Sequence, residues 1–130
     1  MLRFRQITPR FLVTNLGRTI EFYQQFLGFT VDVAWPDEQP TFAILVRDDV
    51  SIGVFEPDEH RPAQPSGGGE YYIEVEDVPA LYATLKDQVP IEWGPEVYFY
   101  GRREFAILDP DRYMLIFTEP TDDPPTCPEQ

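Results

Sequence analysis

Carboxylates are the side chains in this sequence best suited to chemistry. The 130 residues include 23 Asp and Glu, but one histidine, His60, and one cysteine, Cys127. Glu70 and Glu104 fall in stretches that we expect to be extended, where a carboxylate can hold a cation or act as a general base. We therefore take these two residues as candidate catalytic or ligand-binding groups.

The sequence lacks the residue patterns that several other kinds of active site require. The sequence contains no Gly-x-Ser-x-Gly motif and no cysteine–histidine pair, so serine or cysteine nucleophiles are not indicated. Gly67-Gly68-Gly69 precedes a predicted strand and not a helix, which indicates a hinge and not a phosphate-binding loop. His60 lies in a predicted linker with no second histidine to join it as a metal ligand.

Composition limits the partners. The net charge of -13 repels nucleic acid and anionic membranes and favours a cationic ligand, while 42% hydrophobic residues indicate a globular chain. No apolar stretch approaches the ~18 residues of a membrane span, and the start of the chain lacks the apolar run of a signal peptide. Because a single cysteine excludes an intrachain disulfide, we expect a cytoplasmic protein.

The first half reads as strand, helix and three strands. Residues 7–13 are predicted to form an edge strand, because they contain a proline. A helix follows, with Asn15 as N-cap and Gly28 after its last turn. Residues 29–35 form the next strand, and residues 42–55 form a hairpin that turns at Asp48-Asp49.

The second half repeats this order. Residues 70–75 form a strand, and Asp77 caps a helix. Residues 91–99 are extended but interrupted by a bulge or bend at Gly94-Pro95. The last hairpin turns at residues 109–112, where Asp109 can hydrogen-bond back onto the turn. Because the helix caps lie 62 positions apart and the Glu-Pro pairs that end the two hairpins lie 63 apart, the halves form a repeat.

Three stretches together resemble a known family. They are Phe11–Leu16 leading to Phe26-Leu27-Gly28-Phe29, then Glu74–Val78, and then Gly101–Phe105 through Asp109-Pro110-Asp111. In order and spacing they are similar to the vicinal oxygen chelate superfamily of glyoxalases, bleomycin resistance proteins and dioxygenases, and in particular to its bleomycin-resistance-like branch. The likeness covers residues 5–120 and departs at Arg112-Tyr113, where the family usually has Gly-Asn.

The resemblance implies an α+β fold of two βαβββ modules, which form a curved mixed sheet with helices on the convex face and a concave groove for ligand. We expect one domain over residues 1–120, with modules 5–57 and 70–120 and a linker at 58–69. Residues 121–130, which are rich in proline, are expected to form a flexible tail. Family members often dimerise, so a homodimer is expected.

The resemblance also identifies the positions of the family's metal ligands, which here are Thr8, Gly53, Glu70 and Ile116. Only Glu70 is a good ligand for a divalent ion, whereas a catalytic metal needs about three protein ligands. We therefore expect neither a metal nor another cofactor.

Strand alternation separates the two faces of each predicted sheet. Phe11, Val13, Ile73, Val75, Leu115 and Phe117 should pack under the helices, and the opposite face is either a small-molecule cleft or a solvated or dimer-covered surface. Its charge favours a cationic ligand, but Arg10 on this face argues for an anionic group. The candidate ligand-binding residues are Arg10, Trp35, Phe55, Glu70, Tyr72, Trp93, Tyr98, Phe99, Glu104 and Met114.

Three functions fit these residues. The first is a metal-independent binding protein that sequesters a small molecule, as in antibiotic resistance. The second is an enzyme of the same fold, an isomerase, epimerase, lyase or dioxygenase-like protein, that uses Glu70 or Glu104 as general base. The third is an interaction module whose concave face is covered by a partner protein.

Overall fold

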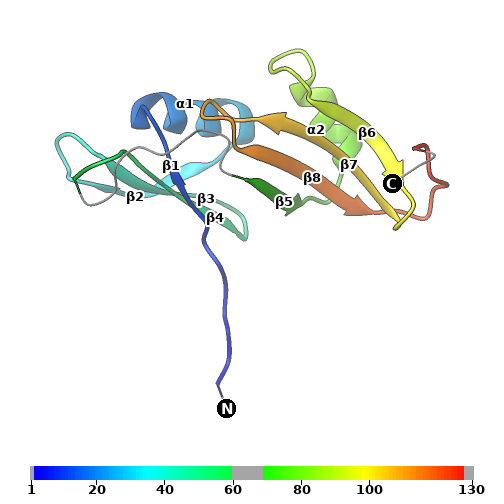
Figure 1. The fold of residues 1–130 in the computed structure, drawn as a ribbon, viewed down its shortest axis with the longest axis horizontal. Coiled ribbons are helices and arrows are strands. Elements are labelled where there is room, and N and C mark those ends of the chain that lie inside the picture. Colours follow the sequence, from blue (N-terminus) through cyan, green and yellow to red (C-terminus); the bar gives the residue numbers. More distant parts are fainter. Residues whose placement is uncertain (1, 60–68, 128–130) are drawn as a thin grey trace. The chain divides into compact units, whose positions relative to one another are not determined.

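The structure is a computed structural model that describes residues 2–59 and 69–127 of the chain. It divides into two compact units, Met1–Pro65 and Ser66–Gln130, each with its own sheet and helix (Figure 1). The boundary falls inside the stretch 58–69 that the sequence assigns to a linker. Most of that stretch, including His60, lies outside the described residues.

The first unit contains one helix and a four-stranded sheet. Its elements are β1 (Arg10–Leu12), α1 (Leu16–Leu27), β2 (Thr30–Trp35), β3 (Phe42–Arg47) and β4 (Val50–Phe55). The strand order is β1-β4-β3-β2, with β1 parallel to β4 and the other pairs antiparallel.

The second unit repeats this topology. Its elements are β5 (Glu70–Glu74), α2 (Val78–Leu85), β6 (Trp93–Tyr98), β7 (Arg102–Leu108) and β8 (Met114–Pro120). The strand order is β5-β8-β7-β6, and β5 is parallel to β8. The prediction of an α+β fold built from two βαβββ modules is thus confirmed.

Local sequence determines where both helices begin. The Asn15 side chain accepts a hydrogen bond from the Arg18 amide at 2.9 Å, and Asp77 accepts one from the Ala80 amide at 3.0 Å, as the sequence predicts. Gly28 ends α1 with a φ of 67°, a conformation that glycine adopts without steric cost.

The second hairpin turns as its sequence indicates. One carboxylate oxygen of Asp109 accepts hydrogen bonds from the amides of Asp111 and Tyr113, at 2.9 and 3.0 Å. The Arg112 amide donates to the Asp109 carbonyl, and Arg112 itself has a φ of 71°. Arg112 therefore adopts the left-handed conformation at the position where the sequence departs from the family's glycine.

The core of each unit lies between its helix and one face of its sheet. Phe11, Val13, Leu115 and Phe117 are buried, as alternation predicts, whereas Ile73 and Val75 are half-buried. In the second unit the Phe105 ring contacts Phe117 and also Tyr82 of α2, with ring centroids 5.2 and 5.5 Å apart. These contacts identify the helix-covered face, and the other face of each sheet is called the helix-free face below.

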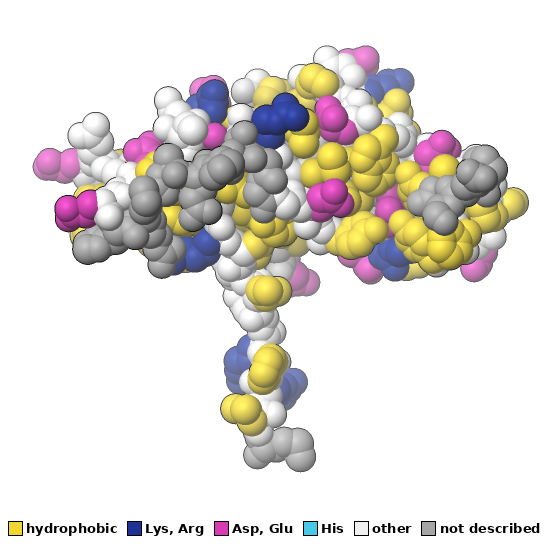
Figure 2. Space-filling view, in the orientation of Figure 1, with side chains coloured by type: hydrophobic (Ala, Val, Ile, Leu, Met, Phe, Trp, Pro, Cys, Tyr) yellow, Lys and Arg dark blue, Asp and Glu magenta, His cyan; other side chains and the backbone are white. Residues whose placement is uncertain are grey.

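The first strand is shorter than predicted. We expected residues 7–13, but β1 begins at Arg10, because Pro9 has no N–H and takes part only through its carbonyl, which accepts from the Gly53 amide at 2.8 Å. The preceding residues extend away from β1 as an arm, on which Leu2, Phe4 and Ile7 are exposed (Figure 2).

The end of the chain makes contacts that the sequence did not predict. The Thr126 amide donates to the Val97 carbonyl and its hydroxyl accepts from the Val97 amide, each at 2.8 Å. Residues 121–127 therefore lie against the edge strand β6, although their prolines suggested a flexible tail; residues 128–130 lie outside the described part. No helix in the described residues combines the length and apolar character needed to span a membrane.

Candidate functional site

Two rows of side chains cross the helix-free face of the second unit. Each row takes one residue from each strand, and the strand register places its members side by side. One row is largely apolar and aromatic: Tyr72, Ile116, Ala106 and Trp93. The neighbouring row is acidic: Glu74, Thr118, Glu104 and Glu96. The face therefore joins carboxylates to aromatic rings.

Glu104 occupies the centre of the acidic row. Its exposed fraction is 1%, although it lies on the face that no helix covers. One carboxylate oxygen accepts a hydrogen bond from the Tyr100 hydroxyl at 2.8 Å, and the other accepts from the Thr118 hydroxyl at 2.9 Å. Within the described residues, no Lys or Arg lies within ion-pairing distance of this carboxylate. Glu104 is thus a buried carboxylate held by two neutral donors.

A hydrogen-bonded chain leads from Glu104 to the edge of the sheet. The Thr118 hydroxyl accepts from Nε of Arg102 at 2.7 Å while it donates to Glu104. The Arg102 guanidinium also pairs with Glu74 at 2.6 Å. Arg102 thus neutralises Glu74, whereas Glu96 accepts a hydrogen bond from the neutral Thr126 hydroxyl at 2.7 Å. Among the described residues, Glu96 and Glu104 are therefore the two carboxylates of the acidic row without a basic partner.

Aromatic rings surround this chain. Tyr98 and Tyr100 stack with centroids 5.7 Å apart and planes within 6°, and Trp93 meets Tyr98 edge-on at 6.1 Å. Burial raises the pKa of Tyr98, with a smaller effect of the nearby Cys127 and Glu104 charges. Burial, followed by hydrogen bonds with Tyr72 and Glu104, raises the pKa of Tyr100. Both phenols are therefore neutral at physiological pH.

These rings leave apolar surface in contact with solvent. Tyr72 is 65% exposed, and Tyr100 and Phe99, in the turn between β6 and β7, are 44% and 67% exposed. A cluster of exposed rings beside a carboxylate is typical of a binding surface for a flat or cationic molecule.

The structure brings several predicted site residues together and leaves others apart. Tyr72, Trp93, Tyr98 and Glu104 meet in the cluster just described. Glu70 and Met114 are register partners on the same face but precede the aromatic row, and Glu70 is exposed. Of the two carboxylates singled out from the sequence, Glu104 has the enclosed setting.

Sequence reasoning missed three members of this cluster. Tyr100 lies in a turn, where alternation gives no face, and its place four residues before Glu104 was the available signal. Thr118 lies next to the helix-facing Phe117, so alternation places it on the helix-free face, but it was not among the candidate residues. Arg102 was not singled out, because its pairing with Glu74 depends on the order of strands in the sheet.

The helix-free face of the first unit carries a different group. The Arg10 guanidinium carbon lies 5.2 Å from the centroid of the Phe42 ring and 4.9 Å from that of Phe55, so two rings flank the cation. Trp35, 65% exposed, is the register partner of Phe42 on edge strand β2. Arg10, Phe55 and Trp35 were predicted site residues, whereas Phe42 was missed.

The positions of the family's metal ligands do not fit a metal. A side chain at Gly53 would approach Cγ of Arg10 to 3.3 Å, so the Arg10 side chain passes over one of these positions. Ile116 offers no donor, and the Thr8 hydroxyl is directed to Ser51 at 3.4 Å. In the described residues no three His, Cys, Asp or Glu side chains are grouped as metal ligands would be. A cation beside Gly53 opposes a second cation there.

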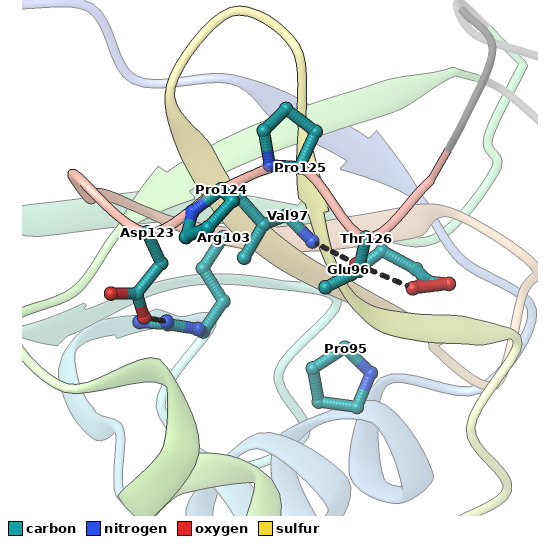
Figure 3. A pocket seen from close by; sticks show the side chains of 8 residues that line it. All are labelled: Pro95, Glu96, Val97, Arg103, Asp123, Pro124, Pro125 and Thr126. Carbon is teal, nitrogen blue, oxygen red and sulfur yellow. Dashed lines mark hydrogen bonds and ion pairs between the residues drawn. The ribbon is translucent and has the colours of Figure 1, made fainter.

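A pocket of about 420 Å³ lies elsewhere in the second unit, between β6 and the segment 123–126 (Figure 3). Pro95, Pro124 and Pro125 line it, and its one arginine, Arg103, is already paired with Glu119 and Asp123. The pocket contains none of the predicted site residues. Because Arg103 is paired with Asp123 and Glu96 is bonded to Thr126 of the same segment, we regard the pocket as the space beside the folded-back chain end and place the candidate site on the helix-free faces.

Comparison with known proteins bears on the fold and its family. The model of the Glyoxalase/Bleomycin resistance protein/Dioxygenase superfamily matches residues 4–117. A comparison with curated proteins gave no match.

Solved structures share the fold at low identity. An antibiotic binding protein from Streptomyces sp. CB03234, TnmS3, has a TM-score of 0.75 at 18% identity over 93% of this chain and 100% of its own. A superfamily member from Sphaerobacter thermophilus has a TM-score of 0.75 at 22% identity, over 91% and 99%. A glyoxalase/bleomycin resistance protein/dioxygenase from Nocardioides has 0.73 at 17%, over 100% and 93%.

Proposed function

Because the chain belongs to the Glyoxalase/Bleomycin resistance protein/Dioxygenase superfamily, we propose that it is a metal-independent small-molecule binding protein. The ligand lies on the helix-free face of the second unit and presents a cationic group to Glu104 and a flat apolar part to the rings around it. A structural neighbour of the chain is an antibiotic binding protein, and this supports a binding role over one in catalysis.

The setting of Glu104 carries the proposal. Burying a carboxylate without an ion-pair partner costs several kcal/mol, and two hydrogen bonds from neutral hydroxyls offset only a part of this. Buried Asp and Glu side chains are almost always paired, so a buried carboxylate without a basic partner among the described residues indicates a place for a cationic ligand. The exposed rings of Tyr72 and Tyr100 beside it supply the apolar contact.

A pair of probes tests the ligand's chemistry. We expect 2-naphthylmethylammonium to bind saturably and to shift the amide resonances of β6, β7 and β8, while the neutral 2-naphthalenemethanol binds at least about tenfold more weakly, since a charge-assisted hydrogen bond contributes about 1.5–3 kcal/mol. Absence of saturable binding by the ammonium probe, or equal binding of both probes, contradicts the proposal.

Variants assign the effect to one carboxylate. Glu104→Gln keeps the shape of the side chain and should weaken the cation about tenfold or more. Glu76→Gln is the matched control, because Glu76 is an exposed residue of the same unit and its loss changes the net charge equally. Equal weakening by both variants would mean that the acidic surface attracts the probe as a whole and that Glu104 does not bind it.

An enzyme of the same fold is the alternative. Glu104 and Tyr100 share a hydrogen bond of 2.8 Å and together offer a base and an acid. An enzyme converts its bound substrate, and Glu104→Gln should abolish that turnover. A binding protein leaves its ligand chemically unchanged. Analysis of a saturated mixture of ligand and protein by mass spectrometry separates the two functions.

The proposal includes a homodimer. Leu2, Phe4 and Ile7 are 87–94% exposed on the arm before β1, so the arm leaves apolar side chains for a second copy to cover. Sedimentation of the full chain and of a chain without residues 1–7 tests this. We expect a dimer for the first and a monomer for the second, and a monomeric full chain would contradict this part of the proposal.

A further inference from the structure

The first unit carries an arginine, Arg10, that forms no ion pair with the carboxylates of the described residues. The sequence holds 23 acidic residues and 10 basic ones, so a basic side chain has abundant partners. Nevertheless, the described residues include no acidic side chain within ion-pairing distance of Arg10, which is exposed on the helix-free face. Its N–H groups are therefore available to a ligand.

Arg10 is also held in place. The rings of Phe42 and Phe55 contact its guanidinium, and Gly53 leaves the room that its side chain occupies, since a Cβ there would meet Cγ at 3.3 Å. Aromatic rings attract the positive charge of a guanidinium but do not replace a carboxylate as the acceptor for its N–H groups. A preorganised arginine loses less conformational entropy on binding than a mobile one.

The surroundings of Arg10 suit an organic oxyanion. The hydroxyls of Thr8 and Ser51 lie one row away on the same face and are only loosely joined, at 3.4 Å. On the other side, Trp35 is largely exposed next to Phe42 and offers a surface for a planar group. A guanidinium fork matches the two oxygens of a carboxylate.

We infer that the helix-free face of the first unit is a binding site for a planar organic carboxylate, with Arg10 as its anchor and Phe42, Phe55 and Trp35 as its apolar walls. Arg10 thus places a positive charge at the face where metal-dependent relatives hold their ion. This inference does not depend on the cation site proposed for the second unit, because the two use different residues of different sheets.

The experiment is an NMR titration of the full chain with 2-naphthoate, its neutral amide 2-naphthamide and inorganic phosphate. We expect 2-naphthoate to saturate and to shift the amides of Phe42, Gly53 and Phe55, and 2-naphthamide to bind at least about tenfold more weakly. Binding of phosphate with equal affinity would overturn the assignment of a planar carboxylate, and no binding by either anion would overturn the site.

Variants test the anchor and its support. Arg10→Gln should weaken 2-naphthoate about tenfold or more, while Arg5→Gln, which removes an equal charge from the exposed arm, should leave the affinity within about twofold. Arg10→Lys keeps the charge but not the planar fork and should still lose most of the affinity. Phe42→Leu removes one flanking ring without touching Arg10 and should weaken binding by a smaller factor.

These outcomes separate the two proposals. If Arg10→Gln leaves the affinity for 2-naphthoate unchanged, the carboxylate site is wrong, whatever Glu104→Gln does to the cation probe. If Arg10→Gln weakens 2-naphthoate and Glu104→Gln has no effect on the ammonium probe, the first site stands and the second does not.

Discussion

Replacing Gly94 with alanine tests the local geometry on which the acidic face depends. Gly94 lies in the bulge of β6, where it adopts a φ of 84° and allows Trp93 and Glu96 to pair with non-adjacent positions of β7. A Cβ at this residue would lie 2.4 Å from the carbonyl oxygen of Glu104 and 2.8 Å from Cα of Phe105. Both neighbours are backbone atoms, which cannot rotate away.

Two terms set the size of the effect. A left-handed conformation costs a residue with a Cβ about 1–2 kcal/mol, and forcing an extra carbon into a packed region costs about 1–3 kcal/mol. We therefore expect Gly94→Ala to lower the free energy of unfolding by about 2–5 kcal/mol. Because relief of the clash moves β6 away from Glu104, we also expect the ammonium probe to bind more weakly.

Urea denaturation measures this loss. A Trp35→Phe background leaves Trp93 as the single tryptophan, so its fluorescence reports the second unit. Gly101→Ala, in the same unit, is the control, because Gly101 has a similar φ of 83° but a Cβ there would meet the Thr121 carbonyl oxygen at an ordinary 3.7 Å. This variant should therefore lose only about 1–2 kcal/mol, the cost of the left-handed conformation. If Gly94→Ala unfolds within about 1 kcal/mol of the parent, the close approach of β6 and β7 described here is wrong.

Three smaller perturbations follow from single contacts. Arg112→Gly should raise the free energy of unfolding by about 0.5–1 kcal/mol in urea, because glycine adopts the φ of 71° without strain; a loss would contradict this. Asp109→Ala should lower it by about 1–3 kcal/mol, since two amides lose their acceptor, and an unchanged midpoint would refute that role. The raised pKa of Tyr100 means that the folded state keeps its proton longer than the unfolded state. Stability should therefore fall as the pH rises above about 10, and less steeply in Tyr100→Phe; equal slopes in urea would contradict this.

The sequence was most informative where structure is local. The caps Asn15 and Asp77, the glycine after α1 and the turn built on Asp109 all act within five residues of their partners, and all were predicted correctly. Their constant spacing in the two halves then predicted the repeated topology, which the two strand orders confirm.

Contacts between distant segments were harder to predict. Arg10 lies between Phe42 and Phe55 only because β1 pairs with β4, and Thr126 and Cys127 reach β6 only in the folded unit. Phe42 itself was within reach of the sequence, because a hairpin that turns at Asp48-Asp49 places residue 42 opposite residue 55. The enclosed position of Glu104 had no such signal.

The duplication shows where the two units differ in chemistry. Both sheets bury apolar side chains under their helices, as packing requires. On the other face, the row Leu12, Phe55, Phe42 and Trp35 of the first unit corresponds by register to Glu74, Thr118, Glu104 and Glu96 of the second. In the preceding row Arg10 corresponds to Tyr72.

Folding alone does not explain this exchange. A solvated face tolerates polar residues of either charge, and both units have the same packing constraint. Packing therefore gives no reason for one unit to have an apolar row beside Arg10 and the other an acidic row beside aromatic rings. Burial of Glu104 works against stability, and the exposed rings of Trp35 and Tyr72 gain little from burial. The difference is accounted for if each face binds a chemically distinct group, a carboxylate at Arg10 and a cation at Glu104.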